Sequence, residues 1–218
     1  MPRKLVIIGA GEHAQVVAEA AQSRPDLWTL AGFVDSDSSA MLSNIPSLPY
    51  LGCDRDLITL AADEEFWAVL GIGGLASSKL RRRIVETFDG SMLNWASIVH
   101  TAAWISPTAT VDEGAVILAG AIVNANATLG RNCIINTGSI IEHDVRVGAW
   151  TIISPGVTIG GGTVLGENSF IGLGAKIRDH ITVSQDATVG MGAVVLKDVP
   201  SGGTVVGVPA RAIGVTHV

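Results

Sequence analysis

His143 is the residue of this chain best suited to chemistry, because an acidic residue stands on each side of it. It belongs to the segment Asn136–Asp144, NTGSIIEHD, in which Glu142 precedes the histidine and Asp144 follows it. A carboxylate beside an imidazole fixes the ring tautomer and stabilises the imidazolium that forms when the ring takes a proton. The segment therefore predicts a general base held by Asp144 or Glu142. An exposed polar residue without a chemical role is the alternative.

The sequence around this segment repeats every six residues. Every sixth residue from Ile105 to Val195 is aliphatic, and the residue four places after each one is nearly always small or β-branched. One large and one small apolar side chain per repeat suit the inside of a narrow, three-sided solenoid of parallel strands, with Gly and Asn at its corners. The run of repeats predicts about five coils, spaced roughly 4.8 Å apart.

This period places a glycine next to the predicted base. Residues eighteen apart stack in such a solenoid, so Gly161 is expected one coil beyond His143, roughly 4.8 Å along the axis. His143 itself holds a corner position that points outward. A glycine beside it predicts an open notch, where a thioester can lie against a backbone N–H. A base beside such a notch is suited to acyl transfer.

The first hundred residues follow a different pattern. Strands are expected at about 4–8, 30–34, 66–71 and 93–99, with helices at about 12–22 and 78–88, and the arginines of the second helix are expected to face water. This β-α-β-β-α-β order predicts an α/β unit with a parallel sheet, which binds ligands beyond the carboxyl ends of its strands. We therefore expect two domains, 1–100 and 101–218.

A glycine-rich loop, GAGEHA, follows the first strand of this unit. Gly9 and Gly11 allow the backbone to approach a phosphate at a helix N-terminus, and Asp35 follows the second strand. His13 either contacts that phosphate, caps a backbone group or simply faces solvent. Because only half of a dinucleotide fold fits before residue 100, the loop predicts a mononucleotide-sized site, with a nicotinamide cofactor as the alternative.

Composition excludes several classes of protein. The chain has 218 residues, 16% of them charged, and a formal net charge of −6. That charge argues against nucleic-acid binding, and so few charges favour a solenoid face covered by other copies of the chain. No signal peptide and no apolar run of about twenty residues is evident, so we expect a cytoplasmic protein without membrane insertion. Cys133 holds a small inward position, as a structural thiol does, and no metal-ligand spacing is present.

Three motifs together resemble the bacterial nucleotide-sugar N-acetyltransferases. They are the loop Ile8–His13, the segment Asn136–Asp144 and the closing GVPA of Gly207–Ala210. The resemblance implies a Rossmann-like half domain followed by a left-handed parallel β-helix, acetyl-CoA as the donor, and a homotrimer with active sites between subunits. Acceptors in that family are UDP-, GDP- or dTDP-linked 4-amino-4,6-dideoxy sugars of glycans and O-antigens. The sialic acid O-acetyltransferases are close relatives.

The resemblance also assigns roles to single residues. It makes His143 the catalytic base, Asp144 its support, and the Gly161 N–H the donor to the acetyl carbonyl. The expected nucleotide-sugar contacts are Gly9, Gly11, His13, Asp35, Asp37, Gly73 and Gly74. The expected acetyl-CoA contacts are Gly161, Lys176, Arg178 and Gly190, with the two cations suited to phosphates.

Two positions depart from the family pattern. Ile152 stands where members often carry a second histidine, and Gly74 stands where Asn is frequent. Both changes leave the base intact but put the acceptor in doubt and allow an acyl group larger than acetyl. Direct N-acetylation in a ternary complex is the preferred interpretation; sugar O-acetylation and a catalytically lapsed nucleotide-binding solenoid are the alternatives. His180 is expected at a corner, His100 in a structural role, and His217 in a disordered C-terminus.

Overall fold

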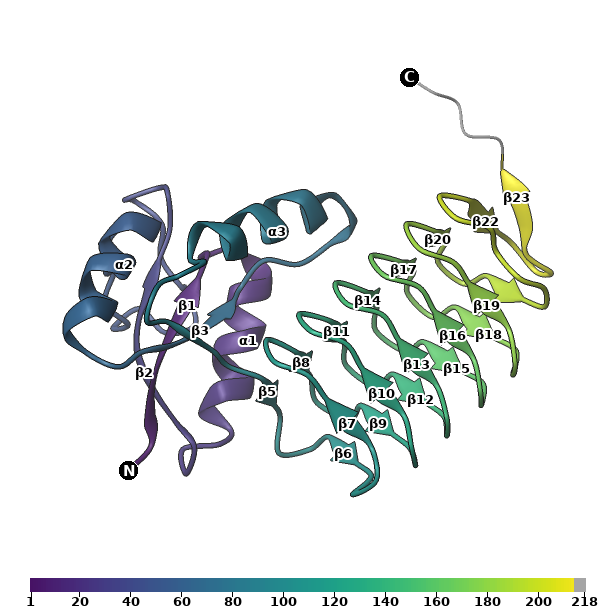
Figure 1. Ribbon diagram of the computed structural model, residues 1–218, viewed down its shortest axis with the longest axis horizontal. Helices are drawn as coiled ribbons and strands as arrows, with labels where there is room; N and C mark the ends of the chain where they lie inside the picture. Colours follow the sequence, from purple (N-terminus) through teal and green to yellow (C-terminus); the bar gives the residue numbers. More distant parts are fainter. Residues whose placement is uncertain (214–218) are drawn as a thin grey trace. The chain divides into compact units, whose positions relative to one another are not determined.

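The chain forms two compact units, Met1–Thr101 and Ala102–Val218. The computed structural model in Figure 1 describes residues 1–213, without the side chain of residue 76, so His217 lies outside the described residues. The first unit is an α/β fold and the second is a β-solenoid, as predicted. No helix within the described residues is long and apolar enough to cross a bilayer.

A parallel sheet with the strand order β2-β1-β3-β4 forms the centre of the first unit. Its strands are β1 (Arg3–Ile8), β2 (Trp28–Val34), β3 (Trp67–Leu70) and β4 (Asn94–Trp95), and the short β5 (Ile98–Val99) follows. Leu5 to Ile8 of the central strand β1 are buried, because the sheet is covered on both faces. The carboxyl ends of β1, β2 and β3 meet at one edge of the sheet.

Three helices and a short 3-10 turn complete this unit: α1 (Glu12–Gln22), α2 (Asp54–Asp63), the turn Leu75–Ser77 and α3 (Ser78–Thr87). The predicted order was wrong in one respect, because it omitted α2. Only Leu57 and Ala61 of this helix are buried, so its apolar stripe is too narrow to be recognised from periodicity. Its start depends on a capping box, in which the backbone N–H of Cys53 donates to the carboxylate of Asp56 at 2.8 Å.

The prediction that all the arginines of α3 face water was also wrong. Arg81 is 1% exposed, whereas Arg83 is exposed. Arg81 lies on the inner face of the helix together with Ile84, three residues later. Phe88, four residues after Ile84, extends the same face, and the side chains of Ile84 and Phe88 are buried. A charged residue thus occupies a core position of this helix.

The second unit is built from strands of two residues, or three in β22 and β23, that stack into a three-sided solenoid (Figure 1). One face carries β6, β9, β12, β15, β18 and β21, the second β7, β10, β13, β16 and β19, and the third β8, β11, β14, β17, β20 and β22, with β23 antiparallel at its end. The strands are β6 (Trp104–Ile105), β7 (Thr110–Val111), β8 (Val116–Ile117), β9 (Ile122–Val123), β10 (Thr128–Leu129), β11 (Ile134–Ile135), β12 (Ile140–Ile141), β13 (Arg146–Val147), β14 (Ile152–Ile153), β15 (Thr158–Ile159), β16 (Val164–Leu165), β17 (Phe170–Ile171), β18 (Lys176–Ile177), β19 (Thr182–Val183), β20 (Thr188–Val189), β21 (Val194–Val195), β22 (Thr204–Val206) and β23 (Arg211–Ile213).

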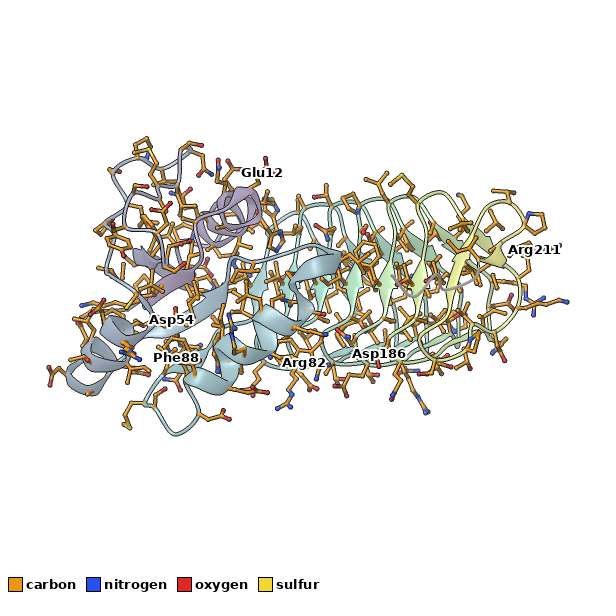
Figure 2. All side chains as sticks on the ribbon, turned by 90° about the horizontal axis from the view of Figure 1, so that it is seen from above. Glu12, Asp54, Arg82, Phe88, Asp186 and Arg211 are labelled. Carbon is orange, nitrogen blue, oxygen red and sulfur yellow. The ribbon has the colours of Figure 1, made fainter. Side chains whose placement is uncertain are left out.

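The interior of the solenoid confirms the predicted repeat. Every predicted inward aliphatic from Ile117 to Val195 is buried, as is every small inward residue from Ala115 to Ala193. Other side chains project outward from the coils along the whole solenoid (Figure 2). The inward residues of the first coil, such as Ile105 and Val111, are only half-buried, because a terminal coil has a stacked neighbour on one side only.

The corners use the left-handed backbone conformation that Gly and Asn favour. Besides glycines, the corner residues with positive φ are mostly Asn or Asp, including Asn126 and Asp144. Trp150 and His180 are the exceptions, with φ of 64° and 54°. An imidazole at such a corner is exposed and projects away from the core.

Candidate functional site

His143 and Asp144 form a hydrogen-bonded pair at the corner that follows β12. Nδ1 of His143 lies 2.8 Å from Oδ2 of Asp144, and the two side chains are 60% and 56% exposed. Asn126, one coil earlier, donates from Nδ2 to the other carboxylate oxygen of Asp144 at 3.1 Å. With Nδ1–H held by the carboxylate, Nε2 is the ring nitrogen that can accept a proton from a substrate.

The charges around this pair support the same protonation pattern. The hydrogen bond to Asp144 raises the pKa of His143, and the negative charges of Asp144 and Glu142 add to that rise. The pKa of Asp144 is lowered by its hydrogen bonds with His143 and Asn126. Asp144 is therefore the group that holds the ring, and Glu142 contributes through its charge. The carboxylate is ionised whenever the imidazole accepts a proton.

Gly161 lies next to this imidazole, as the period predicts. Strand β12 pairs with β15 in the eighteen-residue register, and the N–H of Gly162 donates to the carbonyl of His143 at 2.9 Å. A Cβ at Gly161 would lie 2.7 Å from both Cε1 and Nε2 of His143. The predicted open notch was therefore wrong, because the imidazole itself occupies that space. Within the described residues, the Gly161 N–H donates to no carbonyl or side chain, so it is free for a ligand oxygen.

In the first unit, Asp35 holds the glycine-rich loop in place. Its Oδ2 accepts the N–H of Ala10 at 2.8 Å, and its Oδ1 accepts the N–H of Asp37 at 2.9 Å. Gly9 has φ of +96°, which only glycine adopts without strain, and nothing lies within 4 Å of a Cβ built on Gly11. The loop thus leaves open space at the start of α1. The carboxylate of Asp35 positions this backbone directly.

His13 is packed against Gly73, so these two predicted residues do meet. A Cβ at Gly73 would lie 2.8 Å from Cγ of His13. The pKa of His13 is lowered to about 4, first by burial and then by the positive charge of Arg81. The ring is therefore neutral at pH 7, and it does not cap α1. Its Nε2 is buried and has no hydrogen-bond partner among the residues described.

The other predicted nucleotide contacts lie on loops of the same unit. Asp37 is exposed. Its Oδ1 accepts two hydrogen bonds from Ser39, one from the backbone N–H at 2.8 Å and one from the side-chain hydroxyl at 2.6 Å. These hydrogen bonds lower the pKa of Asp37. Gly74 has φ of +93° and open space around a Cβ, so no side chain projects from it toward a ligand.

The predicted acetyl-CoA contacts are divided between two edges of the solenoid. Arg178 lies two coils beyond Glu142 in the same corner column, and Lys176 belongs to β18 on the face that leads into this corner. Both side chains are exposed. Gly190 follows β20 on another face, so one chain does not bring it to His143. The structure therefore joins Lys176 and Arg178, but not Gly190, to the edge that carries His143.

Two residues of these sites were missed from the sequence. Asn126 lies eighteen residues before Asp144, so the same arithmetic that located Gly161 could have identified it. Arg81 was assigned to a solvent-facing position, although its charge acts on His13. Ile152 is 5% exposed and adds no polar group. His100 is half-buried, and no group of three or more His, Cys, Asp or Glu residues in the described part of the chain is arranged for a metal ion.

Comparison with known families agrees with both units. Residues 4–88 match the PglD N-terminal domain, residues 126–161 the bacterial transferase hexapeptide (six repeats), and residues 162–197 the hexapeptide repeat of succinyl-transferase. Among curated proteins, no match was found.

Solved structures match over nearly the whole chain. PerB from Caulobacter crescentus, in complex with CoA and GDP-perosamine, is 32% identical, with a TM-score of 0.86 and 97% of each chain covered. The chain belongs to the hexapeptide-repeat family of nucleotide-sugar N-acetyltransferases. The acetyltransferase domain of PglB from Neisseria gonorrhoeae FA1090, in complex with acetyl coenzyme A, is 33% identical, with a TM-score of 0.89 and coverage of 98% of this chain and 100% of that one.

WeeI from Acinetobacter baumannii AYE is 26% identical, with a TM-score of 0.85 and coverage of 97% of this chain and 100% of that one. Membership of this family confirms the resemblance found in the three motifs, the left-handed parallel β-helix and the class of enzyme, an acyltransferase.

Proposed function

We propose that this N-acetyltransferase transfers an acetyl group from acetyl-CoA to the amino group of a nucleotide-linked 4-amino-4,6-dideoxy sugar. The observation that carries the proposal is the His143 imidazole, held at Nδ1 by Asp144 at 2.8 Å, with Nε2 beside Gly161. The complexes of PerB with CoA and GDP-perosamine, and of the PglB domain with acetyl coenzyme A, support both substrate classes. We assign residues 1–100 to the nucleotide sugar and 101–218 to acyl transfer.

The chemistry follows from the positions of three groups. The amine nitrogen of the sugar attacks the thioester carbonyl, and Nε2 of His143 takes the proton that the amine loses. The ionised Asp144 stabilises the imidazolium, and the free Gly161 N–H donates to the oxyanion of the tetrahedral intermediate. The C–S bond then breaks, which releases the amide and coenzyme A.

Transfer is direct, without an acyl-enzyme intermediate. The serine and the cysteine nearest in sequence to the base, Ser139 and Cys133, are 0% exposed inside the solenoid. The hydroxyl of Ser139 also donates to the carbonyl of Ser154 at 2.9 Å. A buried, hydrogen-bonded hydroxyl cannot reach a thioester at the surface.

The nucleotide end of the substrate fits the loops of the first unit. Gly9 and Gly11 let a phosphate approach the N-terminus of α1, while His13 supplies a neutral hydrogen bond. The remaining contacts in the proposal are made by Asp35, Asp37, Gly73 and Gly74. Gly74 lacks a side chain and Ile152 is apolar, so neither adds a polar contact that selects the sugar or the acyl chain. Both are to be identified by assays with a panel of nucleotide sugars and acyl donors.

We further propose a homotrimer in the cytoplasm, with each active site between two subunits. Gly190 lies on another edge of the solenoid than His143, so a second copy is needed to bring both to one coenzyme A molecule. Light scattering should give about three times the chain mass of 22.5 kDa. A monomer at micromolar concentration would contradict this assembly.

Sugar O-acetylation is the second candidate, because a carboxylate-held imidazole is also suited to activating a hydroxyl. The test is product analysis after incubation with acetyl-CoA and UDP-, GDP- or dTDP-linked 4-amino sugars, beside matched sugars with a hydroxyl in place of the amine. An acetyl amide resists hydroxylamine, whereas an acetyl ester is cleaved. We expect a hydroxylamine-resistant product only with the amino sugars. A cleavable product would favour O-acetylation, and nucleotide binding without turnover would favour a lapsed enzyme.

A further inference from the structure

Two imidazoles, not one, flank Gly161 and Gly162, the last two of the three glycines that follow β15. The ring of His143, from the preceding coil, lies against Gly161. The ring of His180, from the following coil, lies against Gly162, where a Cβ would be 2.5 Å from Nδ1 and 2.7 Å from Cε1. The two rings therefore approach adjacent residues of one corner from opposite directions along the solenoid axis.

His180 is held in this position by the backbone of its corner. It has φ of 54°, and its N–H donates to the carbonyl of Gly161 at 2.9 Å. The side chain is exposed, and its ring nitrogens make no hydrogen bond with any other described residue. Because Gly162 has no side chain, the ring of His180 can lie directly against the backbone of the coil that carries Gly161 and Gly162.

The two imidazoles differ in what holds them. His143 is bound to Asp144, so one of its nitrogens is already occupied. Among the described residues His180 has no such carboxylate partner, but its charge acts on Asp144. The pKa of Asp144 is lowered first by its hydrogen bond with His143, then by Asn126, and the positive charges of His143 and His180 add to that effect. Residues 144, 162 and 180 stack in one column, so His180 lies two coils, roughly 9.6 Å along the axis, from Asp144.

Gly161, whose N–H makes no hydrogen bond within the described residues, belongs to the coil between those that carry the two rings. An acyl carbonyl bound there has its attacking amine on the side of His143, which must take the amine proton. The sulfur is a separate substituent of the tetrahedral carbon. With the amine directed toward the preceding coil, the sulfur can be directed toward the following coil, which carries His180. The same corner therefore has one imidazole for the attacking amine and one for the leaving sulfur.

We propose that His180 is a second catalytic residue, which hydrogen-bonds the thioester sulfur and protonates the departing thiolate. This inference rests on the proposed acetyl transfer. The new C–N bond forms as Nε2 of His143 takes the amine proton. The C–S bond then breaks with its electron pair on sulfur, and the imidazolium of His180 donates a proton to give the free thiol. His143 returns its proton to solvent, and His180 takes one up.

Dependence on the leaving group tests this role. In His180→Asn the corner keeps a residue type that occupies the same conformation at Asn126 and Asn168, so folding is preserved. With acetyl-CoA the variant should lose about 10-fold or more in kcat/KM, which is less than the usual effect of a general acid, about 10²- to 10⁴-fold, because a thiolate already leaves well. With S-phenyl thioacetate, whose thiolate needs no proton, the loss should stay below about threefold. Equal losses with both donors, or no loss with acetyl-CoA, would overturn the proposal.

A second pair of variants, one test and one control, displaces the ring of His180 without substituting the residue itself. Gly162→Ala drives a Cβ into the ring of His180, whereas Gly174→Ala places a Cβ in open space at nearly the same φ, +66° against +64°. Gly162→Ala should reproduce the donor-dependent loss of His180→Asn, and Gly174→Ala should not. If both glycine variants lose activity equally, strain and not the imidazole is responsible. A wild type that acetylates none of the amino sugars would overturn the proposed function together with this role, whereas an active wild type unaffected by His180→Asn overturns only the role.

Discussion

Replacing Gly161 with alanine tests whether the position of the His143 ring sets the activity. The added Cβ would lie 2.7 Å from Cε1 and Nε2 of the ring, while carbon atoms in contact are separated by about 3.5 Å. The ring must therefore move by roughly 0.8 Å. A shift of that size breaks the 2.8 Å hydrogen bond between Nδ1 and Asp144.

The expected loss is large in activity and small in stability. Misplacing a catalytic group by about 1 Å reduces the rate by about 10²-fold, so kcat/KM of Gly161→Ala should fall to that extent. Gly161 does not have a positive φ, and the ring that it displaces is 60% exposed and can rotate away. The free energy of unfolding should therefore change by less than about 1 kcal/mol.

Two measurements separate ring displacement from general damage. The pKa of His143, followed by NMR titration, should fall from its raised value toward about 6.5 when the bond to Asp144 is lost. In a double-mutant cycle, Gly161→Ala should add little to His143→Ala, because no ring is left to displace. A variant with wild-type activity and an unchanged pKa would refute the reasoning, as would fully additive losses.

Three further predictions follow from contacts in the two units. Asp144→Asn removes the negative charge and with it the charge-assisted hydrogen bond that raises the pKa of His143, so the acidic limb of the pH-rate profile should move to lower pH and kcat should fall about 10²-fold; an unmoved limb would contradict the pairing. Ile159→Asp places an unpaired charge at a 0% exposed position and should abolish folding, as measured by circular dichroism; folded, soluble variant would contradict the assigned interior. Asp35→Ala frees the loop at Ala10 and should raise KM for the nucleotide sugar but not for acetyl-CoA, and equal effects on both would count against two separate sites.

The solenoid could be predicted almost residue by residue, because a six-residue period without interruption sets both the inward positions and the stacking. Ile141 and Ile159 are buried where the period requires, and Gly161 lies one coil from His143. The six-residue period predicts which coil and corner a residue occupies, but not the rotamer of its side chain. Spacing alone therefore suggested an open notch at Gly161, where the rotamer of His143 fills the space.

The first unit was less predictable, because its elements depend on tertiary contacts. The helix α2 has only Leu57 and Ala61 as its buried stripe, so periodicity alone does not reveal it. A buried Arg81 contradicts the usual preference of arginine for water. No sequence rule indicates that burial, and after it the charge of Arg81, keeps His13 neutral.

The most direct test of the central claim is thiol release from acetyl-CoA by the wild type and His143→Asn, each mixed with UDP-, GDP- and dTDP-linked 4-amino sugars. The wild type should release one equivalent of free thiol per N-acetylated sugar with at least one of these acceptors. His143→Asn should retain its affinity for acetyl-CoA and lose about 10²- to 10⁴-fold in kcat. If the variant keeps more than about a third of wild-type kcat from pH 6 to 9, His143 is a corner residue and not the base.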